Sequence, residues 1–365
     1  MRNLKITFVL PMIDMAGGVR STFELANRLQ ERGHNVSIVY PLISLRNGAE
    51  WYDLRSLTVR VFRTMRNIIR GNRVDWFDLK ANLIRVPTLA EKYIPKGDII
   101  IATWWANAYD VNKYENDKGK KFYFIRHYEI WGGPEDLVDG TYKLPLHKIV
   151  TSNWLKELIE KKFNVAVFGP VSNGINFNLF YRELNTFDCH KPRRIGMVYR
   201  RETWKGMKDG FQTFMKAKQK YKDVQLVLFG QRLKYGDAKI IKRIGNVEFY
   251  GSLSKDKLRK AYNSLDIFMF PSHIEGFGNP PMEAMACGTA CISTNVGGIP
   301  DYIIDGKTGL LCAPNLPDKL SDHLLYLLQN EEKRKEIARA GYEHIQQFAW
   351  DRSVDLLEDI FNKVL

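Results

Sequence analysis

The sequence predicts an α/β protein made of two doubly wound domains, in which parallel strands alternate with helices. Two observations support this fold class. Short apolar runs bounded by turn residues recur between amphipathic helical stretches, which is the pattern of βαβ units. The length of 365 residues suits two domains, and a hydrophobic fraction of 45% is ample for two cores.

The first domain is expected to begin with a strand at 4–10 and a loop at 14–18. An amphipathic helix follows at 19–32 and Gly33 ends it, because glycine tolerates the left-handed backbone of a helix end. A second strand at 36–40 completes one βαβ unit. The remaining strands predicted in this domain lie at 98–102, 121–125 and 148–151.

The boundary between the domains is placed near 171–176, where the chain has turn chemistry and no periodicity. The predicted domains are residues 1–172 and 173–350, and a last helical segment covers 351–365. Strands of the second domain are expected at 194–199, 224–229, 247–250, 265–270 and 290–293. Its helices are expected at 208–221, 255–265 and 317–330.

Two carboxylates flank a junction between a strand and a helix in the second domain. The buried strand at 265–270 opens into a glycine-bearing loop that holds Glu275, and a helix begins at Pro280 and ends at Gly288. Glu283 is expected in the first turn of that helix. Such junctions hold phosphorylated ligands in α/β proteins. For an isolated pair the favoured interpretation would be a solvated loop acid at Glu275 and a helix-dipole or capping acid at Glu283.

This segment resembles the Glu-x7-Glu signature of retaining glycosyltransferases of family 4, which have the GT-B fold. That fold has two Rossmann-like domains facing across a cleft, and its last helix crosses back to the first domain. Gly276, Phe277 and Gly278 also match the family pattern, as does the run 283–288. Two further matching stretches lie at 295–300 and 305–311. The resemblance is strong over 194–312 and weak in the first domain.

The resemblance implies roles for these residues. Glu283 would hold the ribose hydroxyls of a nucleotide-sugar, and Glu275 would contact the sugar hydroxyls together with the Phe277 and Gly278 amides. Retention of configuration needs either front-side attack or a double displacement through a carboxylate nucleophile. Since Glu283 is assigned to the ribose, front-side attack is favoured, and the departing phosphate oxygen would take the acceptor proton.

A basic turn follows the first strand of the second domain. It contains Arg200, Arg201 and Lys205. In the family an arginine and a lysine at about this spacing clamp the donor diphosphate, and Arg200 fits the spacing best, with Arg201 as a substitute. Two cations would stabilise the charge that the leaving group gains as the glycosidic bond breaks. The structural alternative is an ordinary solvated turn.

The first domain has two weaker signals. Gly17 and Gly18 resemble the glycine loop after the first strand of the family, where the backbone approaches the donor phosphate or the acceptor. His127 follows the strand at 121–125, at a place where family members often have a histidine that meets the donor sugar. A plain turn and a loop histidine without a catalytic role remain the alternatives.

No metal site or bound cofactor is expected, because neither the four cysteines nor the seven histidines show metal-ligand spacing. The cysteines are interpreted as buried thiols of a reducing cytosol. The N-terminal residues lack the pattern of a signal peptide, and no apolar run reaches the ~20 residues of a membrane span. The expected location is the cytoplasm.

The net charge of +14 indicates what kind of partner the protein could bind. Six arginines lie between 55 and 73 with no acid among them, and a helical wheel separates them from an apolar side. Such a helix could bind an anionic membrane surface or a lipid-linked acceptor, or it could be a surface helix docked by its apolar side. No nucleic-acid motif is present, so nucleic acid is not an expected partner.

These observations predict a metal-independent retaining glycosyltransferase, a hexosyl- or deoxyhexosyltransferase, that moves a sugar from a nucleotide-sugar to a glycan or glycolipid acceptor in polysaccharide or cell-surface glycan synthesis. A nucleotide-sugar epimerase of the same fold would need no acceptor. A basic nucleic-acid-binding protein would keep binding without the two glutamates. A glycan phosphorylase would need a lysine carrying pyridoxal phosphate, and the chain is short for one.

Overall fold

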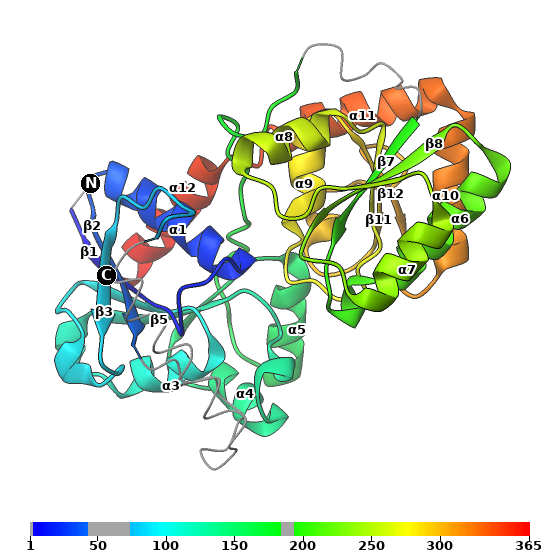
Figure 1. The fold of residues 1–365 in the computed structure, drawn as a ribbon. Helices are drawn as coiled ribbons and strands as arrows, with labels where there is room; N and C mark the ends of the chain where they lie inside the picture. The colour runs from blue at the N-terminus through cyan, green and yellow to red at the C-terminus, as the bar shows by residue number, and fades with distance from the viewer. Residues whose placement is uncertain (1–2, 43–73, 184–192) are drawn as a thin grey trace. The chain divides into compact units, whose positions relative to one another are not determined.

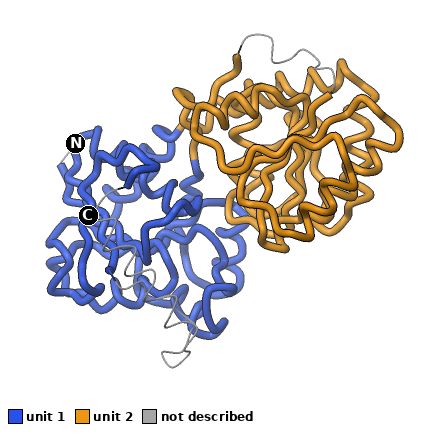
Figure 2. The backbone as a smooth tube through the Cα atoms, viewed as in Figure 1, with its two compact units in different colours: residues 1–173, 350–365 blue, residues 174–349 orange. Residues whose placement is uncertain are grey.

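The computed structural model describes residues 3–42, 74–183 and 193–365 (Figure 1). They form two compact units, shown in Figure 2. The first unit comprises 1–173 and 350–365, and the second comprises 174–349. Each unit contains a six-stranded sheet in which all pairs are parallel. The predicted α/β class with two doubly wound sheets is therefore confirmed.

The sheet of the first unit has the order β3-β2-β1-β4-β5-β6. The direction of winding reverses between β1 and β4, and ligands of such folds bind at the carboxyl end of this switch point. The central strand β4 is buried along its whole length, as a doubly covered parallel strand requires. The strands are β1 (Lys5–Val9), β2 (Asn35–Pro41), β3 (Asn82–Val86), β4 (Ile99–Ala102), β5 (Lys120–Ile125) and β6 (His147–Val150).

The helices of the first unit pack on both faces of this sheet (Figure 1). They are α1 (Gly17–Glu31), α3 (Trp105–Lys113), α4 (Glu135–Tyr142), α5 (Asn153–Phe163) and α12 (Trp350–Val364). The prediction of a loop at Gly17 and Gly18 is wrong, because both residues belong to the first turn of α1. The hydroxyls of Ser21 and Thr22 donate to the Gly17 and Gly18 carbonyls, which is the bonding of a helical turn.

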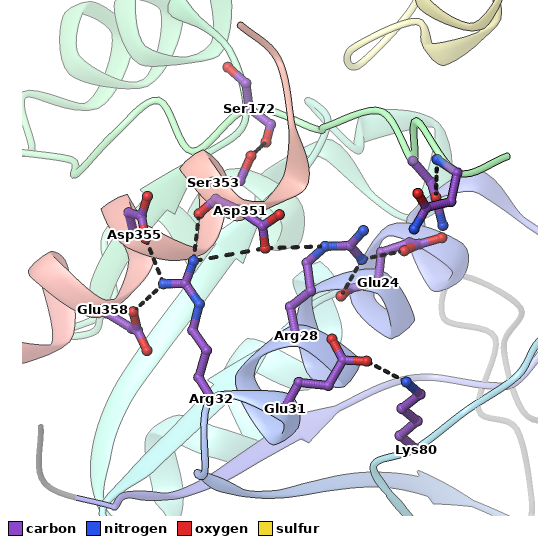
Figure 3. Close-up of polar contacts among 12 residues, drawn as sticks. Glu24, Arg28, Glu31, Arg32, Lys80, Ser172, Asp351, Ser353, Asp355 and Glu358 are labelled. Carbon is purple, nitrogen blue, oxygen red and sulfur yellow. Dashed lines mark hydrogen bonds and ion pairs between the residues drawn. The ribbon is translucent and has the colours of Figure 1, made fainter. Parts of the chain in front are cut away.

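Helix α12 belongs to the first unit although it ends the chain (Figure 3). It begins at Trp350, one residue before the predicted segment 351–365. Its apolar side chains join the core beside α1. Arg32, the residue that follows α1, pairs with Asp355 and Glu358, each at 2.6 Å. The buried His34 ring contacts the other oxygen of Glu358 at 2.9 Å. Burial and this polar network together fasten the chain end to α1.

The second unit has the strand order β12-β11-β10-β7-β8-β9. Its strands are β7 (Arg193–Tyr199), β8 (Val224–Gly230), β9 (Val247–Phe249), β10 (Ile267–Phe270), β11 (Ala290–Thr294) and β12 (Leu310–Cys312). Its helices are α6 (Met207–Lys220), α7 (Tyr235–Ile244), α8 (Lys255–Asn263), α9 (Asn279–Ala286), α10 (Pro317–Gln329) and α11 (Glu331–Ile345). Strands β7 and β10 are neighbours, so the loops that leave them meet at one edge of the sheet.

The arginine segment 55–73 and Cys189 lie outside the described residues. Cys287 and Cys291 are free and buried, as predicted, and burial raises the pKa of both thiols. Cys312 is half-buried. None of the helices in the described ranges has the length and apolar character needed to cross a membrane.

Candidate functional site

Lys205 and Glu275 meet at the edge where β7 and β10 end. The Lys205 ammonium lies 2.7 Å from a carboxylate oxygen of Glu275. Lys205 ends a short 3-10 turn, Thr203–Lys205, after β7, whereas Glu275 comes from the loop after β10. Glu275 is only 9% exposed, so its interpretation as a solvated loop acid is wrong. The pair places a buried negative charge against a cation at the carboxyl edge of the sheet.

Backbone contacts hold these two loops together. The His273 N–H donates to the Trp204 carbonyl at 2.7 Å, and the His273 ring contacts the Asp209 carboxylate at 2.7 Å. Gly206 has a φ of 66°, and a Cβ there would lie 1.8 Å from the Pro271 carbonyl oxygen. Only glycine fits at this position, which is next to Lys205. The close approach therefore sets where the Lys205 side chain starts.

Arg200 and Arg201 are both exposed in the turn that follows β7. The Arg201 N–H donates to the side chain of Gln231, which in turn donates to Glu202 at 3.2 Å. Burial raises the pKa of Glu202, but its hydrogen bonds and the charges of Arg200 and Lys205 lower it further, so the net shift is downward. Glu202 is thus an additional acid within the basic turn, and it was not among the site residues predicted from the sequence.

The stretch 295–300 supports the loop of Glu275. The Gly298 N–H donates to the Gly276 carbonyl at 3.0 Å. Gly297 has a φ of 57°, and a Cβ there would lie 2.3 Å from the Glu275 carbonyl oxygen. The two glycines thus let one loop backbone lie directly against the other.

Phe277 and Gly278 form the entry to α9. The Phe277 ring packs on Tyr302 at 5.5 Å between centroids, and the Tyr302 hydroxyl donates to the Gly278 carbonyl. Gly278 has a φ of 87° and precedes the first residue of α9. These contacts orient the loop backbone where it turns into the helix.

Glu283 lies in the second turn of α9, not in the first turn as predicted, because the helix begins at Asn279. It is buried, and one carboxylate oxygen accepts from the Tyr262 hydroxyl at 2.9 Å. No side chain among the described residues caps the N-terminus of α9. Glu283 is therefore not a capping residue. Tyr262, on α8, holds Glu283 but shows no sequence signal, since a helical tyrosine is usually a core residue.

The predicted residues of the first unit form their own group. Gly17 and Gly18 are exposed at the N-terminus of α1. The His127 Nδ1–H donates to the Tyr128 carbonyl at 2.9 Å, which sets the tautomer of the neutral ring. The rings of Trp131 and Trp154 lie edge-on to His127, with centroids at 6.1 and 6.2 Å. His127 is thus held between aromatic side chains at the carboxyl end of β5.

Metal ligation has no visible support in the described ranges. No group of three or more histidine, cysteine or acidic side chains within 3–42, 74–183 and 193–365 is arranged to hold a metal ion. The loops that follow β7 and β10 instead bring together cationic and carboxylate side chains.

Most of the second unit is similar to a known protein family. Residues 187–344 match the family model described as glycosyl transferases group 1. This stretch, referred to as the group 1 domain, is therefore similar to that family. It contains Lys205, Glu275 and Glu283, so these residues singled out from the sequence lie inside the matching stretch. The predicted resemblance is confirmed at this level, and the assignment to family 4 stays a prediction.

Similar proteins carry related names. The chain is 36% identical over 138 residues to an uncharacterized glycosyltransferase of Methanocaldococcus jannaschii, covering 35% of this chain and 39% of the relative. It is 31% identical over 235 residues to the capsular polysaccharide biosynthesis glycosyltransferase CapM of Staphylococcus aureus, covering 60% of this chain and 59% of the relative. The chain therefore matches less than two thirds of the length of each of these relatives.

The fold is shared with solved structures of other proteins. The structure of Anabaena HepE in complex with UDP-glucose superimposes with a TM-score of 0.73 at 15% identity, covering 99% of this chain and all of the other. Together with the two parallel sheets, this agreement establishes the GT-B type of fold that the sequence predicted.

Proposed function

We propose that this protein is a retaining glycosyltransferase that moves a sugar from a nucleotide-sugar to a glycan or glycolipid acceptor in polysaccharide or cell-surface glycan synthesis. The observation that carries the proposal is the contact between Lys205 and Glu275 inside the group 1 domain. It joins the basic turn and the acidic motif, which are 70 residues apart in the chain. The name of the CapM relative supports polysaccharide synthesis as the setting.

Lys205 and Arg200 would bind the diphosphate of the donor. As the glycosidic bond breaks, the leaving diphosphate gains negative charge, and two fixed cations lower the energy of that transition state without a metal ion. The exposed Arg201 is the alternative partner of Lys205. In the described state Glu275 neutralises Lys205, so a bound donor would share the ammonium with this carboxylate.

Glu283 and Glu275 would hold the rest of the donor. Glu283 is fixed by Tyr262 and is proposed to bind the ribose hydroxyls. Glu275 is proposed to accept hydrogen bonds from the sugar, beside the Gly276, Phe277 and Gly278 backbone. HepE holds UDP-glucose in the solved complex, so uridine diphosphate sugars are the first donors to test.

The transfer step is proposed to be a front-side attack. The acceptor hydroxyl would form the new bond to the anomeric carbon on the face that the diphosphate leaves, and the departing phosphate oxygen would take the hydroxyl proton. His127 is proposed to contact the donor sugar. No bound cofactor is needed, because the nucleotide-sugar itself supplies the activated bond.

A panel of nucleotide-sugars scored by thermal shift tests donor binding, because a ligand of the native state raises the melting temperature. The donor found is then incubated with candidate acceptors. We expect release of nucleoside diphosphate and a product that keeps the donor's anomeric configuration, with little effect of a chelator. Inversion seen by NMR, or activity lost in chelator and restored by a divalent ion, would contradict the mechanism. An altered free sugar formed without acceptor would indicate an epimerase.

The segment 55–73 is proposed to bring the enzyme to an anionic membrane surface on the cytoplasmic side. Its six arginines would contribute about 1 kcal/mol each near such a surface, and salt should weaken the attachment steeply. Co-sedimentation with anionic and neutral vesicles measures it. We expect binding to the anionic vesicles alone and its loss when Arg63, Arg66 and Arg70 are changed to Glu. Equal binding to both vesicle types would show an ordinary surface helix.

A further inference from the structure

A histidine and an aspartate form a pair beside Lys205, and the proposed reaction gives neither of them a role. His273 lies in the loop after β10, and its Nε2 atom is 2.7 Å from a carboxylate oxygen of Asp209. Asp209 belongs to the first turn of α6, the helix that follows Lys205. The two side chains are only 23% and 17% exposed, so water screens this contact less than it screens a surface pair.

The backbone of His273 is attached on the other side of Lys205. Its N–H donates to the carbonyl of Trp204 at 2.7 Å, whereas its ring bonds Asp209. His273 is therefore bonded both to the residue before Lys205 and to the helix after it. The Lys205 ammonium itself bonds Glu275, in the same loop as His273. The two loops are thus joined at three points, and Lys205 lies between the outer two.

Two glycines bring the start of α6 into direct contact with the loop after β10. A Cβ on Gly206 would lie 3.3 Å from Nε2 of His273 and 1.8 Å from the Pro271 carbonyl oxygen. A Cβ on Gly210 would lie 3.2 Å from the Pro271 ring. Residues four apart lie on one side of a helix, so this side of α6 faces the loop. The imidazole therefore packs against the glycine that follows Lys205.

The placement of the Lys205 side chain depends on these contacts, because a lysine has a long, flexible stem. A displacement of about 1 Å at a reacting centre can cost on the order of 100-fold in rate. An ionised carboxylate only accepts hydrogen bonds, so the imidazole donates to Asp209 from Nε2. This bond closes the turn on the side of α6, just as the bond to Trp204 closes it on the side of β7.

We infer that His273 and Asp209 are positioning residues for the transfer step. Their hydrogen bond holds the turn of Lys205 against the loop of Glu275 and so fixes the ammonium that is proposed to stabilise the leaving diphosphate. This inference rests on the proposed function. Neither side chain is assigned a contact with the donor. Their effect therefore runs through Lys205 and belongs to the transition state more than to donor binding.

Kinetics of the full chain, with the nucleotide-sugar found in the thermal-shift panel, test the assignment. His273→Ala and Asp209→Ala should each lower kcat by about 10- to 100-fold and change the KM for the donor by less than about threefold. His273→Gln should recover most of the lost kcat, because its amide presents an N–H donor in place of Nε2. The matched control is His323→Ala, since His323 is a half-buried histidine of α10 whose ring contacts the Leu311 carbonyl at 3.1 Å.

Combined variants show whether the pair acts through Lys205. In a Lys205→Ala background, His273→Ala should lower kcat by less than about twofold more, because coupled residues do not add. Losses that multiply would overturn the positioning role. Full activity in Asp209→Ala, together with equal losses in His273→Gln and His273→Ala, would also overturn it, since His273 would then act on the substrate directly.

A measurement without transfer separates this inference from the proposed function. Acetic anhydride modifies a lysine more slowly when a carboxylate holds its ammonium, and mass spectrometry follows the rate at Lys205 in the protein without ligand. The rate should rise several-fold in His273→Ala and in Asp209→Ala, rise less in His273→Gln and stay unchanged in His323→Ala. An unchanged rate in both alanine variants of the pair would overturn the inference. Faster modification in a protein that transfers no sugar would contradict the proposed function, but the positioning of Lys205 would stand.

Discussion

At the scale of single residues, the ion pair between Lys205 and Glu275 is the most informative contact of the group 1 domain. Glu275 is buried, and its charge is compensated by one lysine in the described state. Lys205 also has a proposed catalytic role, since its ammonium is proposed to bind the leaving diphosphate. Its charge should matter more as the reaction proceeds than while the donor merely binds.

Lys205→Ala is expected to lower kcat by about 100- to 1000-fold with a smaller change in the KM for the donor, because the lost stabilisation grows in the transition state. Kinetics at saturating donor measure this. Lys216→Ala is the matched control, since Lys216 pairs with the exposed Asp318 on the surface of the same unit. Wild-type turnover in Lys205→Ala would show that the diphosphate binds elsewhere.

The raised pKa of Glu129 predicts how the free energy of unfolding depends on pH. Its pKa is raised to about 8 in the folded protein by burial, above the ordinary 4.5 of an unfolded chain. The folded state therefore holds a proton that the unfolded state has lost, and this contribution to stability is present below pH 4.5 and is lost as the pH rises through 8. Between these values the free energy of unfolding should fall by about 1.4 kcal/mol per pH unit from this group.

Glu129→Gln should flatten that slope, because glutamine does not titrate and can still accept from the Trp105 N–H. Denaturant unfolding at pH 6 and pH 8 measures the difference. Glu157→Gln on the exposed face of α5 is the control and should keep the wild-type slope. An unchanged slope in Glu129→Gln would mean that another group carries the pH dependence.

At the scale of elements, the site depends on the adjacency of β7 and β10 and on the short turn after β7. Gly206 is the point of closest approach, since its φ of 66° and the Pro271 carbonyl exclude a side chain. The turn has no room to relax, because the His273 N–H already bonds the Trp204 carbonyl. The placement of Lys205 is thus set by backbone contacts between two loops.

Gly206→Ala is expected to destabilise the protein by more than about 1 kcal/mol, because alanine is strained at this φ and overlaps the Pro271 oxygen. It should also lower kcat by moving Lys205. Gly236→Ala in α7 is the control, since nothing lies within 4 Å of its Cβ position. Alanine there should be neutral or stabilising by about 0.5–1 kcal/mol. Equal stability of the two variants in denaturant unfolding would refute the strain at Gly206.

At the scale of the whole molecule, the two units depend differently on the end of the chain. Helix α12 completes the core of the first unit and brings Glu358 to Arg32 (Figure 3). The same carboxylate also contacts the His34 ring. Glu358 is 5% exposed, so removal of its carboxylate leaves a cation and a ring without their buried partner. The second unit, 174–349, has clusters of its own.

Glu358→Ala is expected to destabilise the first unit by about 3 kcal/mol, the usual cost of breaking a buried pair. Calorimetry should show one transition moved to lower temperature while the transition of the second unit stays in place. The control is Asp359→Ala, the exposed neighbour on α12, which should melt like the wild type. A uniform shift of all transitions would mean that the two units unfold as one.

The sequence by itself determined most strands and helices. Their apolar residues recur with the period of a strand or a helix, and this pattern can be recognised within a few residues without knowledge of a distant partner. The runs at 194–199 and 265–270 became β7 and β10 with small changes at their ends. It also located the group 1 motifs, since their glycines and acids are contiguous in the chain. The start of α1 was missed because two glycines read locally as a loop.

Only the tertiary structure decided which distant residues touch. Strand order places Lys205 against Glu275, and α8 places Tyr262 against Glu283, over separations of 70 and 21 residues. It likewise brings Asp209 to the loop of Glu275, which no local pattern predicts. The reason is physical: periodicity reports whether a side chain faces inward, whereas its partner depends on how sheets and helices are ordered in space.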